Sequence, residues 1–144
     1  MSHELTCRRV AAHEPELAPT LEVMRELRAH LDPAGARERV LRQEREHGYE
    51  LHACFREGRP IAAAGLRPLC TLARGPHLHL DDLVVTASER GSGAGAALLA
   101  HVEAVARARG LLAVFLDARP EAVGFYRRQG YEAHPAPVHK KRLE

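Results

Sequence analysis

Residues 88–110, SERGSGAGAALLAHVEAVARARG, place three glycines at alternate positions directly before a segment with helical periodicity. Without a Cβ atom, Gly91, Gly93 and Gly95 allow the backbone to turn tightly and to lie close to a ligand. The helix that follows would direct free N–H groups and the positive end of its dipole at that ligand. The stretch therefore predicts an anion-binding loop, of the kind that holds the phosphates of nucleotides, dinucleotides or coenzyme A.

The chain around this loop has the size of one domain. Its 144 residues, 45% of them hydrophobic, can bury one core, so we expect a single domain over residues 1–144. It contains no apolar run near the roughly eighteen residues that span a bilayer. Its first residues, MSHELTCRRV, lack the apolar core of a signal peptide. We therefore expect a cytoplasmic protein that does not bind membranes.

Charge and metal-ligand patterns exclude two further classes of partner. The formal net charge is only +2 and the two signs are interspersed, so no nucleic-acid partner is expected. His77 and His79 would share one face of a strand, but the sequence has no HExxH motif, so no metal site is expected. Cys7, Cys54 and Cys70 are odd in number and widely spaced, which predicts reduced thiols.

The first half of the chain contains two helical patterns and several strand patterns. Apolar residues at steps of three and four from Leu17 to Leu31 predict a helix that ends before Pro33. A second helix follows over residues 34–47 and is closed by Gly48. Strands are predicted over residues 5–11, 49–56, from Ile61 onward and over 77–85, with a turn at residues 57–59.

The second half continues this alternation. After the glycine loop the helix extends to about Arg109, where Gly110 caps it. Residues 111–118, LLAVFLDA, form a continuous apolar run that predicts a strand buried on both faces. A short helix is expected over residues 120–130, and the tail from Tyr131 onward as one or two strands. This order predicts an α/β domain in which helices pack on a single mixed sheet.

Two nucleotide-binding interpretations of the loop fit the chain less well. Gly91, Gly93 and Ala96 satisfy a GxGxxA dinucleotide pattern, and Asp117 ends the next strand as a ribose-binding acid would. Too few residues follow Asp117, however, to complete the parallel sheet of a dinucleotide-binding domain. A mononucleotide P-loop requires a GK[ST] sequence after the glycines, and this chain has none.

Two motifs together resemble the GCN5-related N-acetyltransferase (GNAT) family. Five residues after Val85, the stretch RGSGAG fits the family's coenzyme loop, (R/Q)xxGx(G/A). Further along, EAVGFYRRQGYE is similar to the family's AxxFYxxxGF segment. The matching residues are Arg90, Gly91, Ser92, Gly93, Ala94 and Gly95 in the first motif and Ala122, Phe125, Tyr126, Gly130 and Tyr131 in the second. The order of elements extends the likeness over nearly all of the chain.

The resemblance implies a single-domain acyl-CoA N-acyltransferase fold: a mixed, mostly antiparallel sheet, splayed at the coenzyme site and flanked by about four helices. Acetyl-coenzyme A (acetyl-CoA) would lie between the strand ending at Val85 and the strand ending at Asp117. Its pantetheine arm would pair like an extra strand with the backbone of Leu83, Val84 and Val85. Its pyrophosphate would be held by Arg90 and by the N–H groups of Gly91, Ser92, Gly93, Ala94, Gly95 and Ala96. Arg119 stands where family members often carry an asparagine.

Acetyl transfer to an amine needs an acid and a base. The resemblance implies that Tyr126 donates a proton to the coenzyme thiolate, since phenol and thiol pKa values are close enough for this transfer. For the base, the sequence leaves several candidates open: one of Asp81 and Asp82, Asp117, His79, or a water molecule that relays the proton. Asp81 and Asp82 would point to opposite faces of one strand, so at most one of them is expected in the cleft.

The sequence thus predicts a metal-free N-acetyltransferase that moves the acetyl group of acetyl-CoA to a primary amine by direct attack in a ternary complex. Two alternatives stay open: a non-catalytic acyl-CoA-binding or sensor module of the same fold, and a small NAD-binding protein. The acceptor would be selected by the loop around His30, Asp32 and Pro33 and by residues 134–139, and acidic residues near the cleft favour a cationic one. An exposed sheet edge or helix would allow a homodimer.

Overall fold

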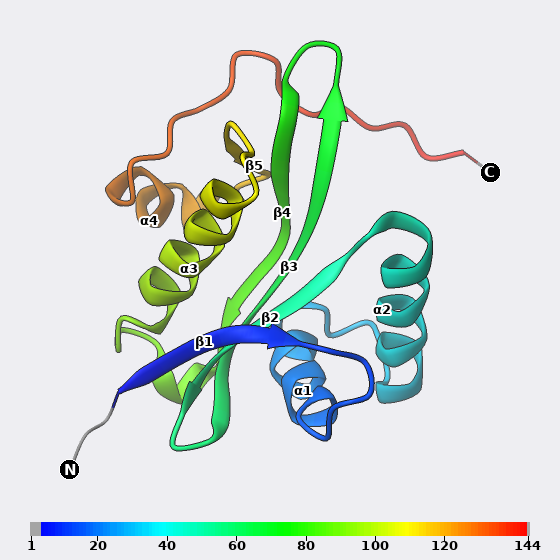
Figure 1. Ribbon diagram of the computed structural model, residues 1–144, viewed down its shortest axis with the longest axis vertical. Coiled ribbons are helices and arrows are strands. Elements are labelled where there is room, and N and C mark those ends of the chain that lie inside the picture. The colour runs from blue at the N-terminus through cyan, green and yellow to red at the C-terminus, as the bar shows by residue number, and fades with distance from the viewer. Residues whose placement is uncertain (1–3, 144) are drawn as a thin grey trace.

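The chain folds into one mixed sheet with helices on both faces (Figure 1). The structure, a computed structural model, describes residues 4–143. Within these residues the strands are β1 (Leu5–Val10), β2 (Glu50–Arg56), β3 (Arg59–Thr71), β4 (Gly75–Val85) and β5 (Val114–Leu116). The α-helices are α1 (Leu17–Leu27), α2 (Pro33–His47), α3 (Ala94–Ala108) and α4 (Val123–Arg128), with 3₁₀ turns at Ala87–Glu89 and Pro120–Ala122.

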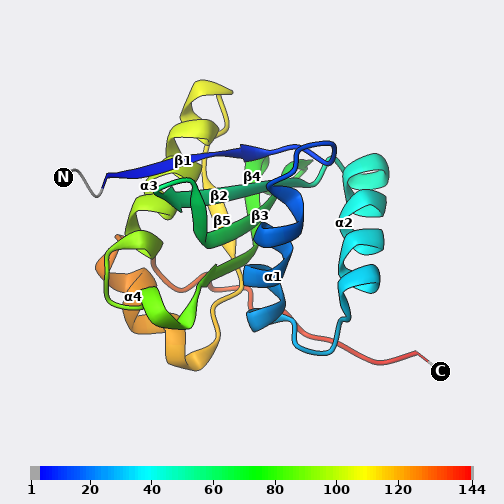
Figure 2. The ribbon, with the colours of Figure 1, turned by 90° about the horizontal axis from the view of Figure 1, so that it is seen from below.

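The strands lie in the order β1-β2-β3-β4-β5. Neighbouring strands are antiparallel except β4 and β5, which are parallel. Helices α1 and α2 cover one face of the sheet, and α3 and α4 cover the other (Figure 2). The predicted α/β architecture, with a mostly antiparallel mixed sheet and about four helices, is confirmed. No helix in the described part of the chain has the length and apolar character needed to cross a membrane.

Local sequence signals explain where the first two helices lie. Leu17, Leu21 and Met24 recur at helical spacing and are all buried, so the apolar stripe of α1 packs on the sheet. Asp32 caps α2 by accepting a hydrogen bond from the Gly35 N–H at 2.6 Å, directly before the proline that opens the helix. Gly48 ends α2 with a φ of 67°, a conformation that glycine adopts without strain.

Two expectations for the C-terminal part are wrong. The apolar run 111–118 forms only the three-residue strand β5, whose residues are half-buried, and Leu112 is 74% exposed. The tail over residues 131–143 forms no strand. β5 pairs only with β4 and lies at the sheet edge, so no second neighbour buries it. Pro135 and Pro137 lack the N–H donors that a tail strand along this edge would need.

A buried polar network fastens the C-terminal end of α3 to β2. Glu50 accepts hydrogen bonds from the Arg109 guanidinium at 2.6 and 2.9 Å, and its Oε1 lies 3.0 Å from His52 Nε2. The other ring nitrogen of His52 lies 2.9 Å from His101 Nε2. Burial raises the pKa of Glu50, but the hydrogen bonds from Arg109 and His52 outweigh it and lower that pKa to about 2.

Replacing Glu50 with Gln is expected to lower the free energy of unfolding by about 2 kcal/mol at pH 7, because charged hydrogen bonds are lost. The pKa of Glu50 falls from its ordinary 4.5 to about 2 on folding, so its contribution is present above pH 4.5 and disappears toward pH 2. Urea denaturation should show the difference between parent and variant shrinking over this interval. Glu38→Gln, on the exposed side of α2, is the control, and its free energy of unfolding should match that of the parent at every pH. If the difference between the parent and Glu50→Gln stayed constant down to pH 2, the lowered pKa of Glu50 would be contradicted.

Candidate functional site

The sheet opens into a fork between β4 and β5. These two strands pair only from Leu78 to Leu80 and from Val114 to Leu116. Beyond Leu80, β4 keeps β3 on one side, while no strand of the described chain pairs with its other edge. The Thr86 N–H donates to the Ile61 carbonyl at 2.8 Å, on the β3 side. Because antiparallel strands alternate, the N–H groups of Leu83 and Val85 face the open edge.

A β-bulge lies at the base of the fork. Gly65 is opposite Asp82 and Leu66 is opposite Leu80, so Asp81 is an extra residue in β4. The bulge shifts the side-chain alternation by one position. As a result Asp81 and Asp82 line the same cavity, and the expectation that at most one of them would do so is wrong.

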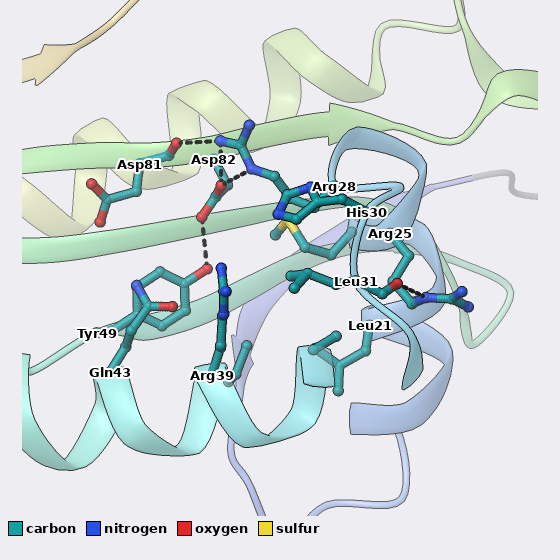
Figure 3. A pocket seen from close by; sticks show the side chains of 13 residues that line it. Leu21, Arg25, Arg28, His30, Leu31, Arg39, Gln43, Tyr49, Asp81 and Asp82 are labelled. Carbon is teal, nitrogen blue, oxygen red and sulfur yellow. Dashed lines mark hydrogen bonds and ion pairs between the residues drawn. The ribbon is translucent and has the colours of Figure 1, made fainter. Parts of the chain in front are cut away.

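This cavity lies between α1, α2 and β4 and has a volume of about 320 Å³ (Figure 3). Asp82 receives hydrogen bonds from Arg28 at 2.6 and 2.9 Å and from the Tyr49 hydroxyl at 2.9 Å. Burial, together with the Asp82 charge, raises the pKa of Tyr49, so its hydroxyl stays protonated and donates to the carboxylate. A Cβ atom on Gly65 would collide with that hydroxyl, which explains a glycine in the middle of β3.

Three titratable side chains that the sequence singled out come together beside the fork. His79 Nε2 lies 3.8 Å from Asp81 Oδ1 and 4.0 Å from Asp117 Oδ2. Burial lowers the pKa of His79, because it disfavours the charged imidazolium more than the two carboxylates favour it. Arg67 holds Asp81 with two hydrogen bonds, at 2.6 and 2.8 Å, whereas Asp117 is 65% exposed. The imidazole is therefore a neutral proton acceptor at neutral pH, flanked by two carboxylates.

Tyr126 lines a second, larger cavity, of about 900 Å³, that follows β5 between α3, α4 and the tail. His79 and Asp117 line the same cavity. Tyr126 packs edge-on against Phe125, with ring centroids 5.2 Å apart. Burial raises its pKa, so the hydroxyl is protonated at neutral pH. The described residues include no hydrogen-bond partner for this hydroxyl, in contrast to the Tyr131 hydroxyl, which donates to Glu103 at 2.8 Å.

The glycine loop leads from the end of β4 into α3. Gly91 and Gly93 have φ angles of 83° and 89°, and open space surrounds the position of a Cβ atom at both, so backbone conformation is what requires glycine there. Gly95 has a different role: a Cβ atom would lie 3.3 Å from Val85 Cγ2, so its absence lets α3 pack closely on β4.

The first turn of α3 carries free hydrogen-bond donors. Within residues 4–143, no acceptor pairs with the N–H groups of residues 93–96, while the Ala97 N–H already bonds the Gly93 carbonyl at 3.0 Å. Arg90 is exposed at the start of the loop, and Arg119 is exposed after β5. Among the described residues, no group of three or more His, Cys, Asp and Glu side chains could hold a metal ion. The loop therefore carries unpaired donors, and their binding of an anion stays a prediction.

No sequence pattern indicated that Arg28, Tyr49 and Arg67 are site residues. They come from the residue after α1, the residue before β2, and β3, and each reaches an aspartate of β4. No spacing rule connects positions so far apart in the chain. Only Gly65 offered a signal, because a glycine inside a strand often marks a close approach of another group.

Comparison with known proteins identifies relatives over most of the chain. The profile of the acetyltransferase (GNAT) family matches residues 16–131. A curated N-acetyltransferase of Bacillus subtilis, itself uncharacterized, is 33% identical over 114 residues, which cover 77% of this chain and 80% of that protein. Glucosamine 6-phosphate N-acetyltransferase of Trypanosoma brucei brucei is 34% identical over 79 residues, or 54% of each chain. The match thus spans about half the length of the trypanosome enzyme.

Solved structures share the fold over nearly the whole chain. An acetyltransferase from Trypanosoma brucei superposes with a TM-score of 0.75 at 26% identity, covering 98% of this chain and 99% of that one. An aminoglycoside acetyltransferase from an uncultured soil metagenomic sample has a TM-score of 0.77 at 18% identity, with coverages of 97% and 96%. The second likeness concerns the fold alone.

Proposed function

Because this chain belongs to the GNAT family of acetyltransferases, we propose that it transfers the acetyl group of acetyl-CoA to a primary amine by direct attack in a ternary complex. The observation that carries this proposal is the fork between β4 and β5, with a glycine loop of free N–H donors at its end. Relatives named as glucosamine 6-phosphate N-acetyltransferases make amino sugars the first acceptors to test.

The residues at the fork fit an elongated thioester with a phosphorylated end. The open edge of β4 at Leu83–Val85 would pair with the pantetheine arm as a strand does. The free N–H groups of residues 93–96 and the Arg90 guanidinium would bind the pyrophosphate, with the α3 dipole adding to the attraction, whereas the Ser92 N–H, expected in this role, already donates to the Glu89 carbonyl at 3.1 Å. Acetyl-CoA supplies the activated acetyl group, and its thioester would lie at the base of the fork, where Asp81, His79 and Asp117 meet.

The amine must be neutral to attack, and an alkyl amine with a pKa of about 10.4 is neutral only roughly one time in a thousand near pH 7.4, a cost of about 4 kcal/mol. We assign His79 as the base, because burial keeps it neutral, and Asp81 and Asp117 as carboxylates that stabilise the imidazolium. Tyr126 would protonate the leaving sulfur. One N–C bond forms and one C–S bond breaks; the amine proton goes to His79 and the Tyr126 proton to the thiolate.

The loop assignment is tested by calorimetric titration with acetyl-CoA, with NAD as the comparison ligand. We expect micromolar binding of acetyl-CoA that Gly93→Glu abolishes, because the variant places a carboxylate at the anion site and strains a left-handed residue. The control is Gly110→Glu, which changes a glycine of similar φ (70°) just beyond the far end of α3 and should bind normally. Binding of NAD instead of acetyl-CoA would refute the proposal.

The role of Tyr126 is tested by Tyr126→Phe. We expect kcat to fall by about a hundredfold with unchanged affinity for acetyl-CoA, because general acid catalysis is lost while the ring still packs. The matched control is Tyr131→Phe, whose hydroxyl donates to Glu103, and its kcat should stay near that of the parent. Equal kcat values in both variants would contradict proton donation by Tyr126. Binding of acetyl-CoA without turnover by the parent would instead favour a non-catalytic acyl-CoA-binding module.

The role of His79 is tested by the pH dependence of His79→Gln. We expect kcat to fall by about a hundredfold at pH 8, where the parent imidazole is neutral. Burial lowers the pKa of His79 below its ordinary 6.5, so the parent imidazole becomes protonated only below pH 6.5. In that pH range the kcat of the parent should fall toward that of His79→Gln, and the ratio of the two kcat values should approach one. Exposed His47→Gln is the control. A ratio independent of pH would exclude His79 as the base.

A further inference from the structure

Both carboxylates in the cavity between α1, α2 and β4 already have guanidinium partners. Arg28 binds Asp82 at 2.6 and 2.9 Å, and Arg67 binds Asp81 at 2.6 and 2.8 Å. Paired in this way, the two carboxylates have little charge left to attract an ammonium group. These two acids line the cavity but do not leave it negatively charged, whereas Asp117, 65% exposed beside His79, lies outside it.

The cavity is also lined by a positively charged side chain that has no partner among residues 4–143. No carboxylate besides Asp81 and Asp82 is among the described residues that line it. Arg25 is engaged, since it donates to the Leu31 carbonyl at 2.8 Å and to Glu22 at 3.0 Å. Arg39, in contrast, has no hydrogen bond or ion pair to any residue between 4 and 143, and its side chain extends from α2 into the cavity beside Tyr49 (Figure 3).

The size of the cavity and its connections limit what it can hold. A volume of about 320 Å³ accommodates a small molecule rather than a folded partner. His79 and Asp117 line the other cavity, but Asp81 lines this one and its Oδ1 lies 3.8 Å from His79 Nε2, so the two cavities adjoin at Asp81. An acceptor whose amine approaches His79 would therefore have its other end in the part of the cavity that Arg39 lines.

We propose that the acceptor is a small amine that also carries an anionic group, a phosphate or carboxylate, and that Arg39 binds this group. A planar guanidinium can donate two parallel hydrogen bonds to either anion, and here it need not leave another partner to do so. The inference rests on the proposed function, since it names the substrate class of the same site. Arg39 is then a specificity-determining residue and has no part in the acetyl transfer itself.

The first test measures binding to the protein saturated with coenzyme A, using two pairs of probes that differ only in a phosphate: glucosamine with glucosamine 6-phosphate, and ethanolamine with phosphoethanolamine. We expect at least one phosphorylated probe to bind about tenfold to a hundredfold more tightly than its partner, as a charged hydrogen-bond pair would provide. Equal affinities within both pairs, or no binding by any probe, would overturn the proposal.

Arg39→Gln should remove this preference and leave the affinity for the unphosphorylated probes unchanged. Arg37→Gln is the matched control, because Arg37 is exposed on the same helix but does not line the cavity. For probes that are acetylated, kcat/KM for the phosphorylated acceptor should fall by the same factor in Arg39→Gln, while kcat/KM for its unphosphorylated partner stays constant. An equal loss for both members of a pair, or an equal effect of both variants, would contradict the proposal.

Titration with acetyl-CoA alone separates the two proposals. If acetyl-CoA binds and amines without an anion are acetylated as well as those with one, only the substrate class is wrong. If acetyl-CoA does not bind, the proposed function itself fails. The preference for phosphate should also weaken as ionic strength rises, because Arg39 is exposed and its charge is screened by salt.

Discussion

The parallel ladder between β4 and β5 ends at Leu80 and Leu116, and the geometry of the site follows from this early separation. A strand that is paired on one side only has backbone groups along its open edge that need partners. The loop after β4 turns at two glycines of positive φ and starts α3 beside the same opening, with Gly95 allowing the helix to contact Val85. The open edge of β4 and the free N–H groups of α3 therefore lie beside the same opening.

The bulge at Asp81 has an equally large effect on the electrostatics. One extra residue turns two adjacent aspartates to the same cavity, and two adjacent carboxylates would repel each other without compensation. Arg67 and Arg28 provide this compensation, and Tyr49 adds a hydrogen bond to Asp82. His79 then stands between carboxylates but is buried enough for its pKa to be lowered. The same ion pairs leave Arg39 as the unmatched charge in the cavity, which is the basis of the proposed substrate class.

Much of the fold was predictable because local physics dominates in those segments. The stripe of Leu17, Leu21 and Met24 and the caps at Asp32 and Gly48 define two helices without reference to the rest of the chain. The glycine loop was equally clear, since only a few structures need glycine at alternate positions before a helix. The failures were β5 and the tail. An apolar run indicates burial in general, but whether a strand has one neighbour or two depends on the other strands, and here β5 has one.

The sequence by itself determined the family, the order of the elements as far as α4, the position of the glycine loop and the choice of Tyr126, Asp117 and Asp81 as candidates, because motifs and periodicity are properties of neighbouring residues. Only the tertiary structure decided that Asp81 and Asp82 share a cavity, that Arg28, Tyr49 and Arg67 hold them, and that Arg39 has no partner among residues 4–143. These facts depend on a one-residue shift in strand register and on side chains from four separate elements. Register and long-range pairing are settled by packing of the whole sheet, and no local pattern encodes them.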